Sequence, residues 1–340
     1  MKPNLIVEIL SIYNKKVKEN WEKWENDASV SPFLYYKYSK FIYNFYRFWA
    51  IKYTARIMCV SDKDGKMLMI MPLKKQIFNK YNLLCDIQGS GAAGCICDPA
   101  LDEATKDACL DAIFSKTGNL LNINRVKPNN PLYSYLTKRA DKYTEKATTV
   151  CVTIPVPEKF EDLFATLSSS NRQNIRTAYN RLNRDGKSYE LKIFDGADKL
   201  GKKERNEIMA LYLKRLFTKY KKPKPIETTI RKFKYNHIKH DTLSLFSLDN
   251  AFHAILYIDG KAAGFFSGIT DRGHSTVVVP RLAIDIDYKF YSPGYILLCE
   301  TLKQLAAGGT IKELDLSRGD EKYKLDIGGV KYYTHSFECK

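Results

Sequence analysis

The stretch YSPGYILLCETLKQLAAGG, residues 291–309, predicts a helix with an unusual first turn. Pro293 and Gly294 stand where the helix begins, and an apolar run follows them. A helix start presents unpaired N–H groups and a partial positive charge, so a small residue there lets a phosphate reach the backbone. The candidates to donate to a pyrophosphate are Ser292, Gly294, Tyr295 and Ile296. The alternative is that Ser-Pro-Gly only starts the helix.

The segments on either side of this helix predict an antiparallel sheet. Before it, strands are predicted in LSLFSLDN, AFHAILYIDG, KAAGFFSGIT and DRGHSTVVVPRLAI, which together cover residues 243–284. After it come the predicted strand IKELDLS at 311–317 and a last strand at 331–339. Earlier in this half we expect a strand at 151–156, a helix, a Ser-rich break and a basic helix up to Asp185-Gly186, then helices at 199–220 and 227–240.

The first half repeats this order of elements loosely. Helices are predicted at 5–26, 33–50 and 102–116, and strands at 82–90 and 120–126. A hairpin is predicted between residues 55–60 and 67–73, because Asp64-Gly65 is a strong turn signal. The stretch 127–150 is polar and without periodicity, which predicts a boundary between an N-terminal domain, 1–150, and a C-terminal domain, 151–340. The fold class is α+β.

Composition narrows the class of protein. The chain has 340 residues, of which 44% are hydrophobic and 13% aromatic, which is typical of a globular protein. No apolar run reaches the roughly 18–20 residues of a membrane span. Eight scattered cysteines indicate reduced thiols and a cytoplasmic location, and their spacing does not match a zinc site, so we expect no metal.

Charge is distributed unevenly. The formal net charge is +17, and residues 171–234 hold 19 Lys and Arg against 7 Asp and Glu. Such an excess favours an acidic partner, namely a phosphate-bearing ligand, nucleic acid or an anionic membrane; a solvated lysine-rich surface is the alternative. The aromatic helix around residues 35–53 is interpreted as core, or else as a contact with the inner face of the membrane.

Two further sets of residues are candidates for chemistry. Asp315 ends a predicted strand and could orient or deprotonate an amine, unless it or Asp320 only pairs with Lys324 to hold the loop. Arg172 and Arg176 lie four residues apart on one face of the basic helix, and arginine forks suit phosphates, so they are candidates to bind an acceptor's phosphate. A solvated helix face is again the alternative.

Several pieces in order resemble a known family. They are SPF at 31–33, MPL at 71–73, LSSSNRQNIRTAYNRLNRDG at 167–186, AILYIDGKAAG at 254–264, YSPGYILL at 291–298 and LDLSRGDEKYKLDIGG at 314–329. Together they span most of the chain and resemble the GNAT-like acyltransferases of the BcsL/CelD family, relatives of the FemABX peptidyltransferases. The resemblance implies a GNAT fold with two GNAT-like halves.

The resemblance also implies an activity. The chain would be an N-acyltransferase that moves an acyl group from acetyl-CoA or another acyl-CoA to an amine, such as an amino sugar on a nucleotide or lipid carrier in polysaccharide or cell-envelope synthesis. It implies that Lys324 stabilises the charge on the carbonyl oxygen and that Tyr323 protonates the leaving thiolate.

Two alternatives stay open at this stage. The usual GNAT phosphate loop, Q/R-x-x-G-x-G/A, is replaced here by SPGY with a single glycine. FemABX relatives share the fold and use aminoacyl-tRNA, so an aminoacyltransferase with tRNA as its partner is one alternative. The other is a non-catalytic GNAT-fold module of a biosynthetic complex.

Overall fold

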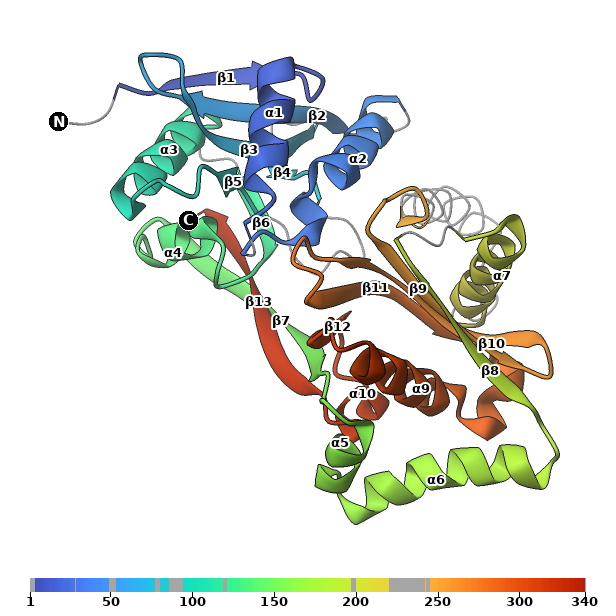
Figure 1. Cartoon of the computed structure of the whole chain (residues 1–340). Helices are drawn as coiled ribbons and strands as arrows, with labels where there is room; N and C mark the ends of the chain where they lie inside the picture. The colour runs from blue at the N-terminus through green and yellow to red at the C-terminus, as the bar shows by residue number, and fades with distance from the viewer. Residues whose placement is uncertain are drawn as a thin grey trace. The chain divides into compact units, whose positions relative to one another are not determined.

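The chain forms two compact units in the computed structural model, which describes residues 4–27, 29–48, 53–76, 80–85, 94–118, 121–196, 200–219, 242 and 245–339. The first unit comprises residues 1–150 and 333–340, and the second comprises residues 151–332 (Figure 1). The expected C-terminal domain ran to residue 340, whereas the structure assigns the final segment to the first unit.

The first unit is a sheet with helices. Its strands are β1 (Ile6–Leu10), β2 (Tyr53–Ser61), β3 (Met67–Gln76), β4 (Tyr81–Leu83), β5 (Ile96–Cys97), β6 (Leu121–Val126) and most of β13 (Val330–Cys339). Its helices are α1 (Lys15–Trp24), the 3-10 helix η1 (Pro32–Leu34), α2 (Tyr36–Phe48), α3 (Glu103–Lys116) and α4 (Pro131–Thr137). The strands lie in the order β1-β2-β3-β4-β6-β13, with β5 beside β3.

Two expectations in this unit are wrong. Residues 5–26 were expected to form one helix, but they form strand β1 and then α1. Strand β1 pairs antiparallel with β2, and Asn14 ends the connection by accepting hydrogen bonds from the first amides of α1. The stretch 127–150 is also more regular than expected, because Asn130 caps α4 in the same way and β7 (Tyr143–Pro155) follows. The hairpin around Asp64-Gly65 and the helix near 102–116 are confirmed.

The second unit has a mixed sheet. Besides the end of β7, its strands are β8 (Tyr189–Asp195), β9 (Ala251–Ile258), β10 (Lys261–Thr270), β11 (Thr276–Ile284) and β12 (Glu313–Arg318). Its helices are α5 (Phe160–Thr166), α6 (Ser169–Arg184), α7 (Lys202–Lys219), the 3-10 helix η2 (Ile286–Tyr291), α9 (Pro293–Gly308) and α10 (Lys322–Asp326). The order is β7-β12-β11-β10-β9-β8, and β11 and β12 are parallel neighbours.

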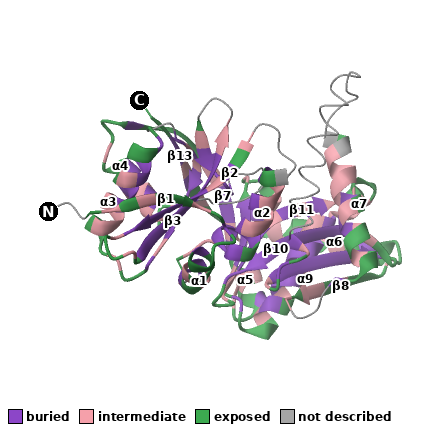
Figure 2. Cartoon of the chain, turned by 90° about the horizontal axis from the view of Figure 1, so that it is seen from above, coloured by how far each residue is buried: buried purple, intermediate pink, exposed green. Residues whose placement is uncertain are grey.

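Helices cover both faces of this sheet. Successive side chains of a strand point to opposite faces, and every residue of β9 is buried, so both of its faces are covered. Buried residues, drawn in purple, fill the sheet around the β10 label in Figure 2. Ala254 and Leu256 belong to the core that includes residues of α6 and α9, whereas Ile255 and Tyr257 belong to a second cluster with residues of α7. The sheet therefore separates α9 from α7, and the two helices can meet only at its rim.

The structure also differs from the sequence-based expectation in the segment just before β9. The strand expected at 243–250 is wrong for the described residues 245–250: residue 245 is helical, and residues 246–250 lead into β9 through turns. The helix expected at 227–240 and residues 86–90 of the strand expected at 82–90 lie outside the described residues.

Candidate active site

Strands β11 and β12 part after a short parallel pairing. The pairs run only from Thr276 with Glu313 to Val278 with Asp315, although β11 continues to Ile284. Helix α9 connects the two strands, so its start lies at the carboxyl end of β11. In α/β sheets ligands bind at the carboxyl ends of strands, where a crevice opens between diverging connections. A ligand site is therefore expected where β11 and β12 separate.

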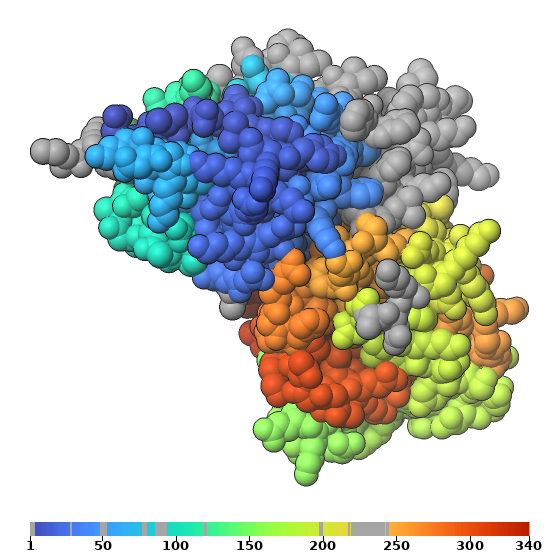
Figure 3. Space-filling model, turned by 45° about the horizontal axis from the view of Figure 1, so that its top comes forward, coloured from blue at the N-terminus to red at the C-terminus, as the bar shows by residue number. Residues whose placement is uncertain are grey.

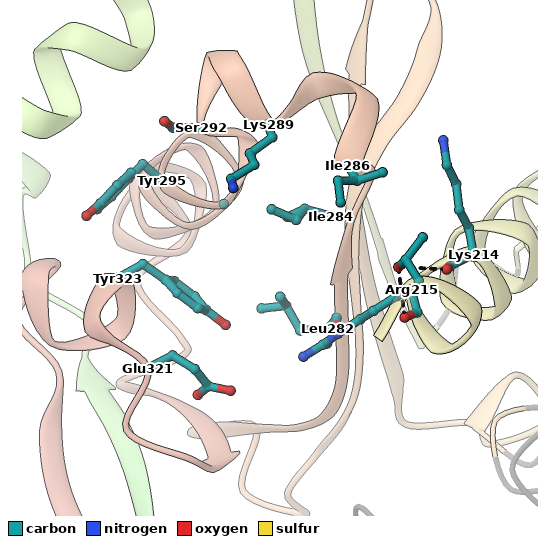
Figure 4. A pocket seen from close by; sticks show the side chains of 12 residues that line it. Lys214, Arg215, Leu282, Ile284, Ile286, Lys289, Ser292, Tyr295, Glu321 and Tyr323 are labelled. Atoms are coloured by element: carbon teal, nitrogen blue, oxygen red, sulfur yellow. Dashed lines mark hydrogen bonds between the residues drawn. The ribbon is translucent and has the colours of Figure 1, made fainter. Parts of the chain in front are cut away.

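A cavity of about 470 Å³ lies at this place (Figure 4). The residues that line it are Lys214, Arg215 and Thr218 of α7, Leu282 and Ile284 of β11, Ile286 and Lys289 of η2, Ser292, Gly294 and Tyr295 at the start of α9, and Glu321 and Tyr323 at α10. Its floor is apolar and its rim is charged. Three of the four residues predicted to bind a pyrophosphate, and one of the three predicted to be catalytic, are thus brought together.

The start of α9 forms one wall of the cavity. Ser292 adopts a left-handed conformation with φ of 51°, which turns the chain out of η2, and its carbonyl accepts the amide of Tyr295 at 3.0 Å. Pro293 has no N–H group, so the amide of Gly294 is the first donor of the helix. A Cβ atom at Gly294 would lie 3.8 Å from Ile284 and 4.0 Å from Tyr323. The lack of a side chain at Gly294 leaves space at this wall of the cavity, although the backbone conformation there does not itself require glycine.

Lys289 adds a positive charge beside the helix start. Its side chain extends toward the first turn of α9 (Figure 4) and, within the described residues, makes no hydrogen bond or ion pair. Lys289 is exposed and belongs to η2. Figure 3 shows orange-to-red segments of the second unit on the face turned to the viewer. An ammonium and a helix N-terminus at one cavity wall favour an anion. Ile296, by contrast, is fully buried in the core, so it can offer only its backbone.

The two tyrosines of the cavity point in different directions. The hydroxyl of Tyr323 extends into the cavity and has no hydrogen-bond partner among the described residues (Figure 4). Burial, and then the charge of Glu321, raise the pKa of Tyr323, so the hydroxyl carries its proton at neutral pH. The hydroxyl of Tyr295 turns away and donates to Asp326. Tyr323 is therefore the tyrosine placed to give a proton to a bound molecule.

Lys324 lies behind the cavity wall and does not line it. Its buried ammonium donates to three backbone carbonyls of the segment that follows the parting of the strands, at 2.8–3.2 Å from Leu316, Arg318 and Gly319. It also pairs with Glu321 at 2.9 Å. These bonds satisfy backbone carbonyls at the end of β12 that would otherwise be buried without a hydrogen-bond donor. They favour a role for Lys324 in positioning this backbone segment. The oxyanion role expected of Lys324 stays a prediction.

Asp315 is also enclosed by its own neighbours. It is 1% exposed and accepts hydrogen bonds from the amide of Ser317 at 2.8 Å and from the hydroxyl of Tyr332 at 2.7 Å. Ser317 has φ of 53°, and the pairing of β12 with β7 is irregular here. The carboxylate thus holds this irregular turn, and it is not among the residues lining the cavity. Its role toward an amine stays a prediction.

Arg172 and Arg176 line a different groove. It has a volume of about 670 Å³ and lies among α5, α6 and Lys303 of α9. Arg172 donates to the carbonyls of Ala165 and Leu167, which ends α5. Arg176 is exposed and lies 5.5 Å from the ring centre of Phe164. The two arginines therefore share a groove with each other and not with the cavity, and their binding of a phosphate stays a prediction.

Sequence reasoning missed four charged residues of the cavity. They are Lys214, Arg215, Lys289 and Glu321. The basic excess of residues 171–234 includes Lys214 and Arg215, but neither stands in a motif. Lys214 is neutralised by Asp285 and Asp287, at 2.5 and 2.6 Å. Only the packing of α7 against β11 brings Arg215 to the cavity.

Comparisons with known proteins agree with this arrangement. Residues 169–325 match the family model described as "Acetyltransferase (GNAT) domain", and this range contains every residue of the cavity. No curated protein matches the chain. Membership of the BcsL/CelD family is not tested by these comparisons and stays a prediction.

Solved structures extend the likeness over the whole chain. A tandem GNAT protein from the clavulanic acid biosynthesis pathway has a TM-score of 0.53 at 10% identity, covering 99% of this chain and 98% of that one. A conserved protein of unknown function from Bacteroides thetaiotaomicron has a TM-score of 0.53 at 13% identity, with 98% and 99% coverage. L-PGS from Bacillus licheniformis has a TM-score of 0.52 at 11% identity, with 84% coverage of each chain.

At such identities the likeness concerns the fold. Its extent over both units agrees with the loosely repeated order of elements in the sequence. The fold class predicted from the sequence is confirmed: the chain has the GNAT fold with two GNAT-like halves, and its second half carries the match to a GNAT acetyltransferase domain.

Proposed function

We propose that the protein is an N-acyltransferase that transfers an acyl group from acetyl-CoA or another acyl-CoA to an amine. One observation carries the proposal: the start of α9 and the ammonium of Lys289, which has no partner among the described residues, line one cavity where β11 and β12 separate within a GNAT fold. A cavity with an anion-binding end and an apolar floor suits a ligand that joins phosphates to an apolar arm.

The residues of the cavity have distinct roles in this proposal. The amide of Gly294, the hydroxyl of Ser292 and the ammonium of Lys289 would hold the pyrophosphate of CoA. The acceptor amine attacks the thioester carbon directly, the C–S bond breaks, and Tyr323 supplies a proton to the departing thiolate. Lys324 and Asp315 keep β12 in the shape that leaves room for the ligand.

The acceptor and the location stay as predicted from the sequence. An amino sugar or another polysaccharide or cell-envelope precursor, carried on a nucleotide or lipid, is the proposed acceptor, and its phosphates are proposed to bind Arg172 and Arg176. The proposed location is the cytoplasm, with contact to the inner face of the membrane where the acceptor is lipid-linked. None of the described helices is long and apolar enough to cross a membrane.

A thermal-shift and calorimetric titration with acetyl-CoA, CoA and bulk tRNA, at low and moderate salt, tests the donor. A ligand at 100 times its Kd stabilises the native state by about 2.7 kcal/mol, so a rise in the unfolding midpoint with CoA at moderate salt is expected. Lys289→Gln is expected to weaken CoA binding about tenfold. Its matched control is Lys312→Gln, at an exposed lysine outside the cavity.

Other outcomes decide against the proposal. A shift with tRNA alone that disappears as salt rises points to the aminoacyl-tRNA-dependent alternative, because phosphate contacts weaken steeply with salt. The absence of any shift with CoA and tRNA points to the non-catalytic module.

A further inference from the structure

The cavity wall opposite the start of α9 presents the guanidinium of Arg215. Arg215 extends from α7 across the floor, and its Nη1 donates to the carbonyl of Leu282. Within the described residues Arg215 makes no ion pair, whereas its neighbour Lys214 is held by two aspartates. Of the five N–H donors of a guanidinium, most are therefore left for another partner.

The surroundings of Arg215 make it energetically unfavourable for its guanidinium to lack a counterion. Arg215 is half-buried, and the apolar side chains of Leu282 and Ile284 line the cavity beside it. A charge that is partly removed from water without a counterion is destabilising, and it gains most when an anion arrives. A planar guanidinium binds a carboxylate through two parallel hydrogen bonds, which a lysine cannot do. The wall is therefore suited to a carboxylate.

A carboxylate faces the same space from the other side. Figure 4 shows the side chains of Arg215, Glu321 and Tyr323 extending toward one another across the cavity. Glu321 pairs with Lys324 at 2.9 Å and is about half exposed, so it keeps acceptor capacity on the cavity side. Arg215 and Glu321 form no ion pair with each other. A ligand with charges of both signs could bridge them.

On the basis of the acyltransferase function proposed above, we propose that the acceptor is a zwitterionic α-amino acid, whose carboxylate binds Arg215 and whose ammonium faces Glu321. The inference keeps the acyl-CoA donor proposed above and offers, in place of the amino sugar predicted from the sequence, an acceptor whose amine lies adjacent to a carboxylate. Arg215 is then the residue that determines specificity, since an amine without the carboxylate leaves the guanidinium unpaired.

The reaction balances with these partners alone. The ammonium first loses a proton to solvent, and the free amine forms a bond to the acyl carbon. The C–S bond of the thioester breaks, and the second proton leaves nitrogen while the thiol departs protonated. The products are an N-acyl amino acid and CoA, with one proton released, and no oxidant or further reactant is needed.

The test compares acceptors that differ only in the carboxylate. Thiol release from acetyl-CoA is measured with free α-amino acids, their carboxamides and their decarboxylated amines, and with glucosamine as an amine that lacks a carboxylate. The wild type is expected to use at least one amino acid ten- to a hundredfold better, in kcat/KM, than its carboxamide, which is the range of one charge-assisted hydrogen-bonded pair.

Substitutions in α7 test whether Arg215 causes the preference for acceptors with a carboxylate. Arg215→Gln is expected to remove that preference by raising KM for the amino acid far more than KM for the carboxamide, while the Kd for CoA changes less than twofold. Arg215→Lys is expected to restore part of the preference. Arg205→Gln is the matched control, because Arg205 is an exposed arginine of the same helix that does not line the cavity.

Several results would overturn the inference. Equal use of amino acids and carboxamides, a preference for glucosamine, or an unchanged preference in Arg215→Gln each contradicts it. Loss of CoA affinity in Arg215→Gln would show that the guanidinium binds the donor instead.

Failure of the donor proposal is distinguished by equilibrium dialysis with labelled amino acids alone. If CoA does not bind the wild type, dialysis alone still tests whether an amino acid binds at Arg215. Binding that Arg215→Gln removes supports the amino acid site, and no binding at millimolar concentration refutes it.

Discussion

At the scale of single residues, the contacts of a side chain distinguish a residue that positions the backbone from one that can react with a ligand. Lys324 and Tyr323 are neighbours in sequence, and the resemblance gave both a catalytic role. The structure surrounds the ammonium of Lys324 with backbone carbonyls and leaves the hydroxyl of Tyr323 open to the cavity. Adjacent residues of a short helix point in different directions, so one can face a ligand while the other holds the backbone behind it.

Lys324→Met should therefore destabilise the fold. The change leaves three carbonyls and Glu321 without their donor, which is expected to lower the free energy of unfolding by about 3 kcal/mol or more. Lys312→Met, at an exposed lysine, should change it by less than about 0.5 kcal/mol. Urea unfolding at pH 7 measures both. If Lys324→Met keeps wild-type stability and loses only turnover, the catalytic role is correct.

At the scale of elements, the site depends on how two strands separate. Parallel pairing ends at Val278 and Asp315, and the chain then uses a helix start, a buried lysine and an irregular turn to satisfy the released backbone groups. Specific hydrogen bonds therefore stabilise the separation of the two strands. Gly294 stands at its edge, and the size of that side chain sets how close a ligand comes to the first amides of α9.

A graded series at Gly294 tests this element. Gly294→Ala meets only ordinary contacts and favours the helix, so stability should hold and CoA should bind within a few-fold of wild type. Gly294→Val brings two methyl groups to the helix start and is expected to weaken CoA binding more than tenfold. Calorimetric titration measures the affinities.

The matched control is Gly308→Val at the other end of α9. A Cβ at Gly308 meets nothing within 4 Å. Wild-type affinity in Gly294→Val would contradict the assignment of the pyrophosphate to this turn.

At the scale of the whole molecule, each unit has its own core, and the last strand is shared between them along the chain. Tyr332, which bonds Asp315, belongs to the second unit, whereas Phe337 is buried in the core of the first. Residues 333–339 of β13 cover the edge of β6, where His335 pairs with Val126 and Phe337 with Ile123.

Phe337→Ala should loosen the first unit. Removing a buried phenyl ring costs roughly 3–5 kcal/mol, so amide hydrogen exchange in β6 and in α4, whose Tyr133 touches Phe337, is expected to accelerate at least tenfold. Phe290→Ala, at a half-exposed ring, serves as the control. Exchange in β6 that stays at the wild-type rate would show that β13 does not stabilise that edge.

Much of this organisation could be predicted from local signals. The Asp64-Gly65 hairpin, the strands between Ala251 and Ile284 and the helix at 293–308 each follow from turn residues and from periodicity within the segment. Strand β1 was mistaken for a helix because its partner, β2, lies some fifty residues away.

The sequence by itself determined the fold class and the helix start at Pro293-Gly294, since these depend on turn residues and on the order of elements along the chain, and the resemblance of its motifs to a family indicated Tyr323 as a candidate residue. Only the tertiary structure decided that Arg215, Lys289 and Glu321 share a cavity with them and that Lys324 and Asp315 do not. The physical reason is that a cavity is formed by side chains of distant segments, and their directions depend on how α7, β11 and α9 pack.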